Sequence, residues 1–422
     1  MPKTLAEWLA HLESIHPKSI ELGLMRVDEV RRRLDLAPDF PILVVGGTNG
    51  KGSVCAMTES ILHSAGYRVG CYTSPHLLCY NERVRIGKQQ VGDEVLCASF
   101  EAIEKARGDI SLTYFEFGTL AAMQLFAAHN VDVAILEVGL GGRLDAVNVF
   151  DADCAVVTSV DIDHTDYLGE TREQIAYEKA GIFRAGRIAI FADGDMPCAI
   201  ADHADKIGAH LWRIGRDYGF AAHQGQWDYR GSASERLALP YPALRGAFQL
   251  NNASAVLAAL DALKDRLPVG MDAIRRGLNE VQLPGRFQFL PGRPQMILDV
   301  AHNPHAARSL AQNLAALPPA PHTFAVFAML KDKDASGVVN ALDPCIDTWL
   351  VAGIDAPRGA TAQEMAEVLH AAGVRGRIAC FSCTAKALAH ACNEAGENDR
   401  IIVFGSFYTV ADAIACKSGQ VK

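Results

Sequence analysis

The sequence lacks the features that mark several large protein classes. No apolar run approaches the roughly 20 residues that cross a bilayer, and the start of the chain has no apolar h-region. We therefore expect neither a membrane span nor a signal peptide. Long blocks of Lys and Arg are also missing and the net charge is −9, which argues against nucleic acid as a partner. The nearest basic cluster, Arg31 to Arg33, lies beside Val27 and Val30 at helical spacing and indicates a solvated helix face.

Disulfide and zinc frameworks are not indicated either. The eleven cysteines are irregularly spaced, and an odd number without an export signal is typical of reduced thiols. Cys380 and Cys383 form a C-x-x-C pair, but no second pair follows, so we interpret them as structural residues. These observations predict a cytoplasmic protein.

What the sequence does contain is the composition of a large globular protein. Of its 422 residues, 50% are apolar and 21% are charged, which is typical of folded soluble chains. The length exceeds one ordinary core and predicts two domains. No short repeat or low-complexity tract is present, which argues against a solenoid.

Apolar runs alternate with helix-period segments over residues 41–191, which predicts a parallel sheet flanked by helices. A Pro-Gly break at 283–287 precedes a second alternating series. We therefore predict an α/β protein with a doubly wound N-terminal domain, 1–284, and a smaller C-terminal α/β domain, 288–422. Between 192 and 250 we expect a short strand-rich excursion before a helix near Asn251. The predicted strands are 40–45, 67–72, 131–138, 154–159, 187–191, 296–300, 323–327, 348–351, 377–381 and 401–404.

A glycine-rich loop, GGTNGKGS at 46–53, lies between the first strand and its helix. Backbone N–H groups and a helix N-terminus at such a position surround an anion. The standard pattern G-x-x-x-x-G-K-[ST] is not met, because Val45 stands at the first glycine position and Gly52 separates Lys51 from Ser53. We predict nucleotide binding, with Lys51 reaching the outer phosphates. The predicted binding residues are Asn49, Gly50, Lys51, Gly52 and Ser53.

This variant loop resembles that of the folylpolyglutamate synthase branch of the Mur ligase superfamily. Further segments resemble the family's signatures in the same order, and together they extend over essentially the whole chain. Val147 and Tyr408 depart from the pattern, where threonine and often histidine are expected. The segments are LGLMRV at 22–27, TSPH at 73–76, ISLTYFEF at 110–117, EVGLGGRLD at 137–145, DHTD at 163–166, EKAGI at 178–182, LPGR at 283–286, LDVAHNP at 298–304 and GSF at 405–407.

The resemblance implies a Mur ligase-like fold, with an N-terminal P-loop-type doubly wound ATPase domain and a smaller C-terminal Rossmann-like α/β domain. It also implies ATP-dependent amide formation through an acyl phosphate, which requires cations that neutralise phosphate charge. Mg²⁺ prefers oxygen ligands, so Ser53, Ser74 and Glu137 are metal candidates, and the resemblance adds His164. Glu137 ends an apolar run, where an acid is costly unless it is paired or metal-bound. Asp161, Asp163 and Asp166 could form a rival acidic cluster or cap the next helix, as could Thr171.

Lys179 follows Glu178 on a predicted helix and would ordinarily be an exposed lysine in a helical ion pair. The resemblance implies instead that it is catalytic and that CO₂ carbamylates its amine, which requires a low local pKa.

In the second domain, Asp299 and His302 are expected at a strand end, at the carboxyl edge of the sheet. A metal pair of His302 and His305 is disfavoured, because Pro304 opposes the helix that such a pair needs. The resemblance implies that Asn252, Arg286 and Asp299 contact ATP, and we assign His302 to orienting phosphate or substrate.

The resemblance also implies a folate site formed by Gly23, Leu24, Met25 and Arg26, by Phe115 in a YFEF loop, and by Ala146. Phe115 could stack on a pterin or pack in the core. The C-terminal domain would bind glutamate or folate at an interdomain cleft.

The predicted enzyme is therefore a monomeric ligase that uses ATP and Mg²⁺ to add L-glutamate to dihydropteroate and to tetrahydrofolate. A monofunctional folylpolyglutamate synthase and a P-loop kinase remain alternatives. A muropeptide-type ligase is disfavoured, because the phosphate loop begins by residue 46, where that class carries another domain.

Overall fold

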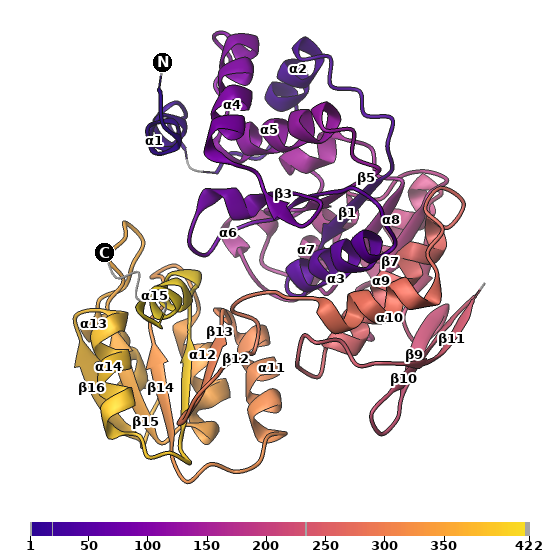
Figure 1. The fold of residues 1–422 in the computed structure, drawn as a ribbon. Helices are drawn as coiled ribbons and strands as arrows, with labels where there is room; N and C mark the ends of the chain where they lie inside the picture. The colour runs from indigo at the N-terminus through magenta and orange to yellow at the C-terminus, as the bar shows by residue number, and fades with distance from the viewer. Residues whose placement is uncertain (1, 19, 233, 418–422) are drawn as a thin grey trace. The chain divides into compact units, whose positions relative to one another are not determined.

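The computed structural model describes residues 2–18, 20–232 and 234–417 and divides them into two compact units, each α/β (Figure 1). Unit 1 consists of Met1–Ala243 and Leu250–Val281, and unit 2 of Leu244–Gln249 and Gln282–Lys422. The chain therefore passes between the units three times. The short segment Leu244–Gln249 was not expected to be part of the second unit. The predicted domains, 1–284 for ATP binding and 288–422 for binding glutamate or folate, stay a prediction.

Unit 1 is built on an eight-stranded sheet in the order β4-β3-β2-β5-β1-β6-β7-β8. Strands β2, β5, β1, β6, β7 and β8 run parallel, whereas β3 and β4 pair antiparallel at one edge. The central strands β1 and β5 are buried at every residue, which is why they are continuous apolar runs in the sequence. The strands are β1 (Ile42–Gly46), β2 (Val69–Tyr72), β3 (Val84–Ile86), β4 (Gln89–Gln90), β5 (Val133–Glu137), β6 (Cys154–Val157), β7 (Ile188–Phe191) and β8 (His210–Arg213).

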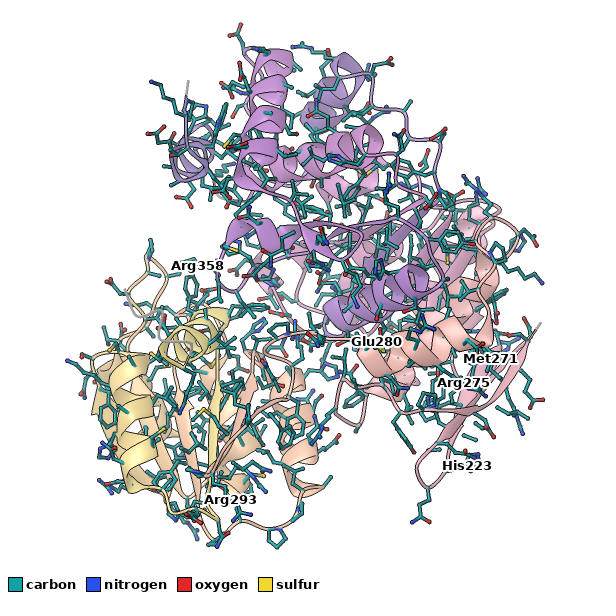
Figure 2. The ribbon with its side chains drawn as sticks, viewed as in Figure 1. His223, Met271, Arg275, Glu280, Arg293 and Arg358 are labelled. Carbon is teal, nitrogen blue, oxygen red and sulfur yellow. The ribbon has the colours of Figure 1, made fainter. Side chains whose placement is uncertain are left out.

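Helices cover this sheet, and a separate antiparallel sheet, β11-β10-β9, completes unit 1. Helix α10 packs closely on α3: a Cβ at Gly277 would lie 2.5 Å from the Ile61 Cα. Met271, Arg275 and Glu280 mark the course of α10 from its first residue to its last (Figure 2). The elements are α1 (Leu5–Ser14), α2 (Met25–Arg33), α3 (Lys51–Ser64), η1 (Tyr80–Arg83), α4 (Asp93–Arg107), α5 (Tyr114–Ala128), η2 (Ala146–Val149), α6 (Thr165–Leu168), α7 (Arg172–Ala180), α8 (Cys198–Ile207), β9 (Tyr218–Ala222), β10 (Trp227–Gly231), β11 (Glu235–Leu239), α9 (Gln249–Ala262) and α10 (Met271–Glu280).

Unit 2 is a six-stranded sheet in the order β12-β13-β17-β14-β15-β16, parallel except for β12 at the edge. Its core contains a cluster of aromatic rings: Phe327 lies 5.4 Å from Trp349 and 5.1 Å from Phe404, centroid to centroid. The elements are β12 (Gln288–Leu290), β13 (Gln295–Asp299), α11 (Pro304–Ala315), β14 (Thr323–Phe327), α12 (Ala335–Leu342), η3 (Asp343–Cys345), β15 (Thr348–Ala352), α13 (Ala362–Ala371), β16 (Arg377–Phe381), α14 (Thr384–Glu394), β17 (Arg400–Phe404) and α15 (Phe407–Lys417).

One local expectation was wrong. The YFEF segment is not a loop: it is the first turn of α5, capped by Thr113 and Glu116. The expectation for Pro304 is confirmed, since α11 begins at this residue and His302 lies before the helix that carries His305. Proline fits there because the first helical position needs no backbone N–H donor. Among the described residues, no helix is both long and apolar enough to cross a membrane.

Candidate active site

The phosphate loop follows β1 and leads directly into α3. Two glycines allow its conformation: Gly47 has φ +137°, and Gly50 has φ +92°, which L side chains rarely adopt. A Cβ at Gly47 would lie 1.9 Å from the Thr158 Oγ1, and one at Gly50 would lie 2.8 Å from the Asn252 Oδ1. The loop is therefore pressed between the end of β6 and helix α9, which places Asn252 beside it.

Hydrogen bonds hold this loop in place. The Lys51 ammonium donates to the carbonyls of Gly47 at 3.0 Å and Thr48 at 3.2 Å. The Asn49 N–H donates to the Ser159 hydroxyl at 3.2 Å, and the Asn49 carbonyl accepts from Thr158 Oγ1 at 2.6 Å. Ser53 is buried in the first turn of α3. The five residues predicted to bind nucleotide thus lie in one loop at a helix N-terminus, as anion binding requires.

Glu137 and Ser74 lie at the same edge of the sheet. Glu137 ends β5 opposite Val45 of β1, and its side chain is buried. Its Oε2 accepts a hydrogen bond from the Ser74 N–H at 3.1 Å. The Glu137 carboxylate therefore holds the backbone of Ser74, the second predicted oxygen donor, and lies beside the strand that leads into the phosphate loop. Oxygen donors of this kind fit Mg²⁺, which commonly completes its shell with water and substrate phosphate.

His164 adopts a backbone conformation that is uncommon for a histidine. Its φ of 53° is left-handed, at the N-cap of α6, and its N–H donates to Asp163 Oδ1 at 2.9 Å. Such conformations are enriched at functional sites. Among the described residues, no group of three or more His, Cys, Asp or Glu side chains could hold a metal ion. A rival cluster of Asp161, Asp163 and Asp166 is therefore not seen, and α7 is capped by Thr171.

Lys179 is buried, not exposed as an ordinary helix lysine would be. Only 4% of it is accessible. Burial and, next, the neighbouring charge of Lys51 lower the Lys179 pKa to about 7, although Asp163 and Asp145 oppose this. The turn after β5 packs tightly on α7, because a Cβ at Gly142 would lie 2.9 Å from the Lys179 carbonyl oxygen. The low pKa that carbamylation requires is thus present.

The predicted folate residues lie near one another in unit 1. The Gly23 N–H donates to the Leu144 carbonyl at 3.1 Å, close in sequence to Ala146. Leu24 is the N-cap of α2 and Met25 begins it, with 88% of Met25 exposed. The Arg26 guanidinium donates to Glu116 Oε1 at 3.1 Å, which ties α2 to α5.

Phe115 is partly buried and packs against the core of unit 1. Its ring lies 5.6 Å from that of Tyr72, and a Cβ at Gly139 would lie 2.7 Å from its Cζ. Ala146, in contrast, is buried at the start of η2. The two departures from the family pattern differ in setting, since Val147 is fully buried and Tyr408 is 53% exposed.

In unit 2 the predicted residues gather at the carboxyl end of β13. Asp299 accepts from the N–H groups of Phe287 and Ala301, each at 2.8 Å, and burial raises its pKa against the opposing charge of Arg286. The His302 Nδ1 lies 2.8 Å from the Val300 carbonyl oxygen. His302 and Arg286 both pack against Phe407. The centroids of the His302 and Phe407 rings lie 6.1 Å apart, and the Arg286 Cζ lies 5.5 Å from the centroid of the Phe407 ring. Arg286, Asp299 and His302 are therefore brought together.

Comparisons with known sequences identify the family. The family model of the Mur ligase middle domain matches residues 45–260, and that of the Mur ligase glutamate ligase domain matches 285–407. The dihydrofolate synthase/folylpolyglutamate synthase of Escherichia coli K12 is 47% identical over 408 residues, which cover 96% of this chain and 94% of the relative. The chain belongs to this family of Mur ligases.

Solved structures of family members are similar over their whole length. Escherichia coli FolC in complex with DHPP and ADP superposes with a TM-score of 0.95 at 45% identity, covering 100% of both chains. A bifunctional folylpolyglutamate synthase/dihydrofolate synthase with Mn, AMPPNP and L-glutamate bound has a TM-score of 0.91 at 47% identity, covering 99% and 98%. The predicted family, the two-domain α/β Mur ligase fold and the ATP-dependent ligase activity are confirmed.

The structure adds residues to the candidate site that were not predicted from the sequence. Asp145 is the N-cap of η2 and is only 3% exposed. Burial raises its pKa to about 7, although hydrogen bonds from nearby backbone N–H groups partly oppose this shift. Lys51 and Lys179 are both close enough to interact with it electrostatically. Thr158 and Ser159 hold the phosphate loop from β6. Asp145 could have been found from the sequence, because it ends the family segment EVGLGGRLD at 137–145. Thr158 and Ser159 lie in none of the family segments, so the sequence did not indicate them.

Proposed function

We propose that the chain joins L-glutamate to the carboxylates of 7,8-dihydropteroate and of tetrahydrofolate, converting ATP to ADP and phosphate. The observation that supports this most is the phosphate loop of unit 1, which begins beside Glu137 and whose Lys51 is near enough to the buried Lys179 to lower its pKa. A carboxylate does not react with an amine at neutral pH until one of its oxygens becomes a leaving group. Transfer of the ATP γ-phosphoryl group to that oxygen supplies one, as an acyl phosphate.

Each predicted nucleotide-binding and metal-binding residue has a proposed role in this reaction. Lys51 exchanges its contacts with the Gly47 and Thr48 carbonyls for ATP phosphates, and the loop N–H groups of residues 49–53 surround them. Ser74, Glu137 and His164 would hold Mg²⁺, whose charge offsets that of the phosphates. The glutamate α-amine then attacks the acyl carbon and phosphate leaves. Asn252, Arg286 and Asp299 are proposed to contact ATP, and His302 to orient phosphate or substrate.

A neutral Lys179 amine adds CO₂ and releases a proton, which converts a buried cation into a carbamate anion. Its pKa of about 7 supports this step, because a fully protonated amine cannot react. The folate substrates are proposed to contact residues 23–26, Phe115 and Ala146. A monomeric state and a cytoplasmic location stay predictions.

The proposal is tested by measuring ADP release with MgATP, L-glutamate and bicarbonate, with dihydropteroate, tetrahydrofolate or no acceptor. We expect glutamate-dependent turnover with both pterins, and a rate about 10²- to 10³-fold lower for Lys51→Ala, the loss typical of removing a donor that stabilises transition-state charge. Turnover with tetrahydrofolate alone would indicate a monofunctional folylpolyglutamate synthase. Glutamate-independent turnover would instead favour a kinase.

A further inference from the structure

Arg85 connects three parts of unit 1 that are separate in the sequence. It lies on β3, with 19% of its side chain exposed, and forms a two-pronged ion pair with Glu59 of α3, at 3.1 Å from Nε to Oε1 and 2.8 Å from Nη2 to Oε2. Glu59 is only 6% exposed in its side chain. A buried carboxylate and guanidinium in this planar geometry fix each other in position as well as in charge.

The same guanidinium holds the loop that follows β2. Its Nη1 donates to the Thr73 hydroxyl at 3.1 Å and to the Glu82 carbonyl at 2.8 Å. Thr73 is further fixed by its own N–H, which donates to the Arg83 carbonyl at 2.9 Å. The next residue is Ser74, whose N–H donates to Glu137. Arg85 therefore acts one residue away from the hydroxyl and the carboxylate that are proposed to hold Mg²⁺.

The other end of this connection leads to the phosphate loop. Glu59 lies on α3, about two turns after Lys51, and a helix transmits position rigidly over that distance. A displaced Arg85 would thus separate the Ser74 loop from the helix that begins at Lys51. Neither Arg85 nor Glu59 belongs to the residues assigned above to ATP, Mg²⁺ or folate.

We propose that Arg85 is a positioning residue for the reaction, which holds the Ser74 loop and Glu137 in register with the phosphate-loop helix through Glu59. The inference rests on the proposed function of Ser74 and Glu137 as metal ligands. Residues that orient metal ligands typically contribute 10- to 100-fold to metal affinity or activity. Arg85 acts through Thr73 and Ser74 and touches no reacting atom.

The test uses the full chain with two variants. Arg85→Lys keeps the charge but cannot contact Glu59 and Thr73 together, and Thr73→Val removes only the hydroxyl that Arg85 reaches. The matched control is Arg236→Lys, which alters a comparably buried pair with Asp261, 13% and 5% exposed, in the β9–β11 sheet. Binding of Mn²⁺ in the presence of AMPPNP is followed by the electron spin resonance signal of free Mn²⁺, and turnover is measured against Mg²⁺ concentration.

We expect Arg85→Lys to weaken Mn²⁺ binding by about tenfold and to raise the half-saturating Mg²⁺ concentration similarly, with a smaller change in kcat at saturating Mg²⁺. Thr73→Val should change Mn²⁺ binding and the half-saturating Mg²⁺ concentration in the same directions. Arg236→Lys should change neither quantity, even if it lowers Tm as much as Arg85→Lys does. Unchanged Mn²⁺ binding in Arg85→Lys would overturn the proposal, and if that variant does not fold, unchanged binding in Thr73→Val would do so. A wild-type chain that binds Mn²⁺ but lacks glutamate-dependent turnover would count against the proposed function and leave this inference standing.

Discussion

The Lys179 side chain owes its chemistry to its surroundings rather than to its neighbours in the sequence. It is 4% exposed, and its pKa is lowered to about 7 by burial and then by Lys51. An exposed lysine keeps a pKa near 10.4 and is almost fully protonated at neutral pH. Because the folded pKa lies below this value, a large fraction of Lys179 is neutral and nucleophilic at physiological pH.

This predicts a pH-dependent requirement for CO₂. Above pH about 7 the Lys179 amine is neutral and bicarbonate should activate the enzyme, whereas below it the protonated amine cannot react and activity should fall. Carbon-13 nuclear magnetic resonance with labelled bicarbonate should show a carbamate signal in the wild type. The signal should be missing in Lys179→Arg, which keeps a cation without a reactive amine. A signal of equal size in that variant would assign the carbamate elsewhere.

Other residues of the site were predictable to different degrees. Lys51 and Glu137 follow from local pattern, a glycine loop and an acid that ends an apolar strand. Arg85 and Glu59 were not found, because their pairing exists only once β3 has folded against α3. The proximity of Asp145 to Lys51 and Lys179 likewise depends on packing between elements distant in sequence.

At the scale of elements, burial decides what the sequence reveals. Strands buried along their whole length, such as β14 and β17, were located to within a residue, since their apolar runs are uninterrupted. The exposed two-residue strand β4 gave no signal, and α8 was missed within the region expected to be strand-rich. The β9–β11 sheet has exposed residues on each strand, so only its general nature could be predicted.

This small sheet is attached to α9 by a cluster around Asp261. The carboxylate accepts from the Tyr229 hydroxyl at 3.0 Å, the Ser234 hydroxyl at 2.5 Å and the Arg236 guanidinium at 2.5 Å. By contrast, His223 lies at the turn between β9 and β10, at the sheet's outer end (Figure 2). The Asp261 cluster is thus a buried anchor for an otherwise exposed sheet.

Asp261→Ala should lower the free energy of unfolding by about 3–5 kcal/mol, because it leaves Arg236 buried without its carboxylate. The control, Glu235→Ala, removes an exposed ion pair with Arg230 on the same sheet and should cost no more than about 1 kcal/mol. Urea unfolding measures both. Equal losses in the two variants would show that the cluster does not anchor the sheet.

On the scale of the whole molecule, the chain joins its two units at three points. Segment Leu244–Gln249 belongs to unit 2, where the Ala247 N–H donates to Asn313 Oδ1 at 2.9 Å and the Arg245 Cζ lies 4.4 Å from the Phe289 ring. The segment runs directly into α9, the helix that carries Asn252. A single Pro-Gly break was visible in the sequence, whereas this short excursion has no compositional boundary and could not be predicted.

The proposed reaction as a whole depends on a reactive intermediate, the acyl phosphate, that links phosphorylation to amide formation. An acyl phosphate reacts with hydroxylamine to give a hydroxamate, so the intermediate can be captured. With MgATP, tetrahydrofolate and hydroxylamine but no glutamate, we expect ADP and a folate hydroxamate in equal amounts, both lost in Lys51→Ala. Added L-glutamate should suppress the hydroxamate, because its amine competes for the same acyl carbon. ADP release without hydroxamate would mean that ATP is hydrolysed directly, and the acyl phosphate step would then be wrong for this chain.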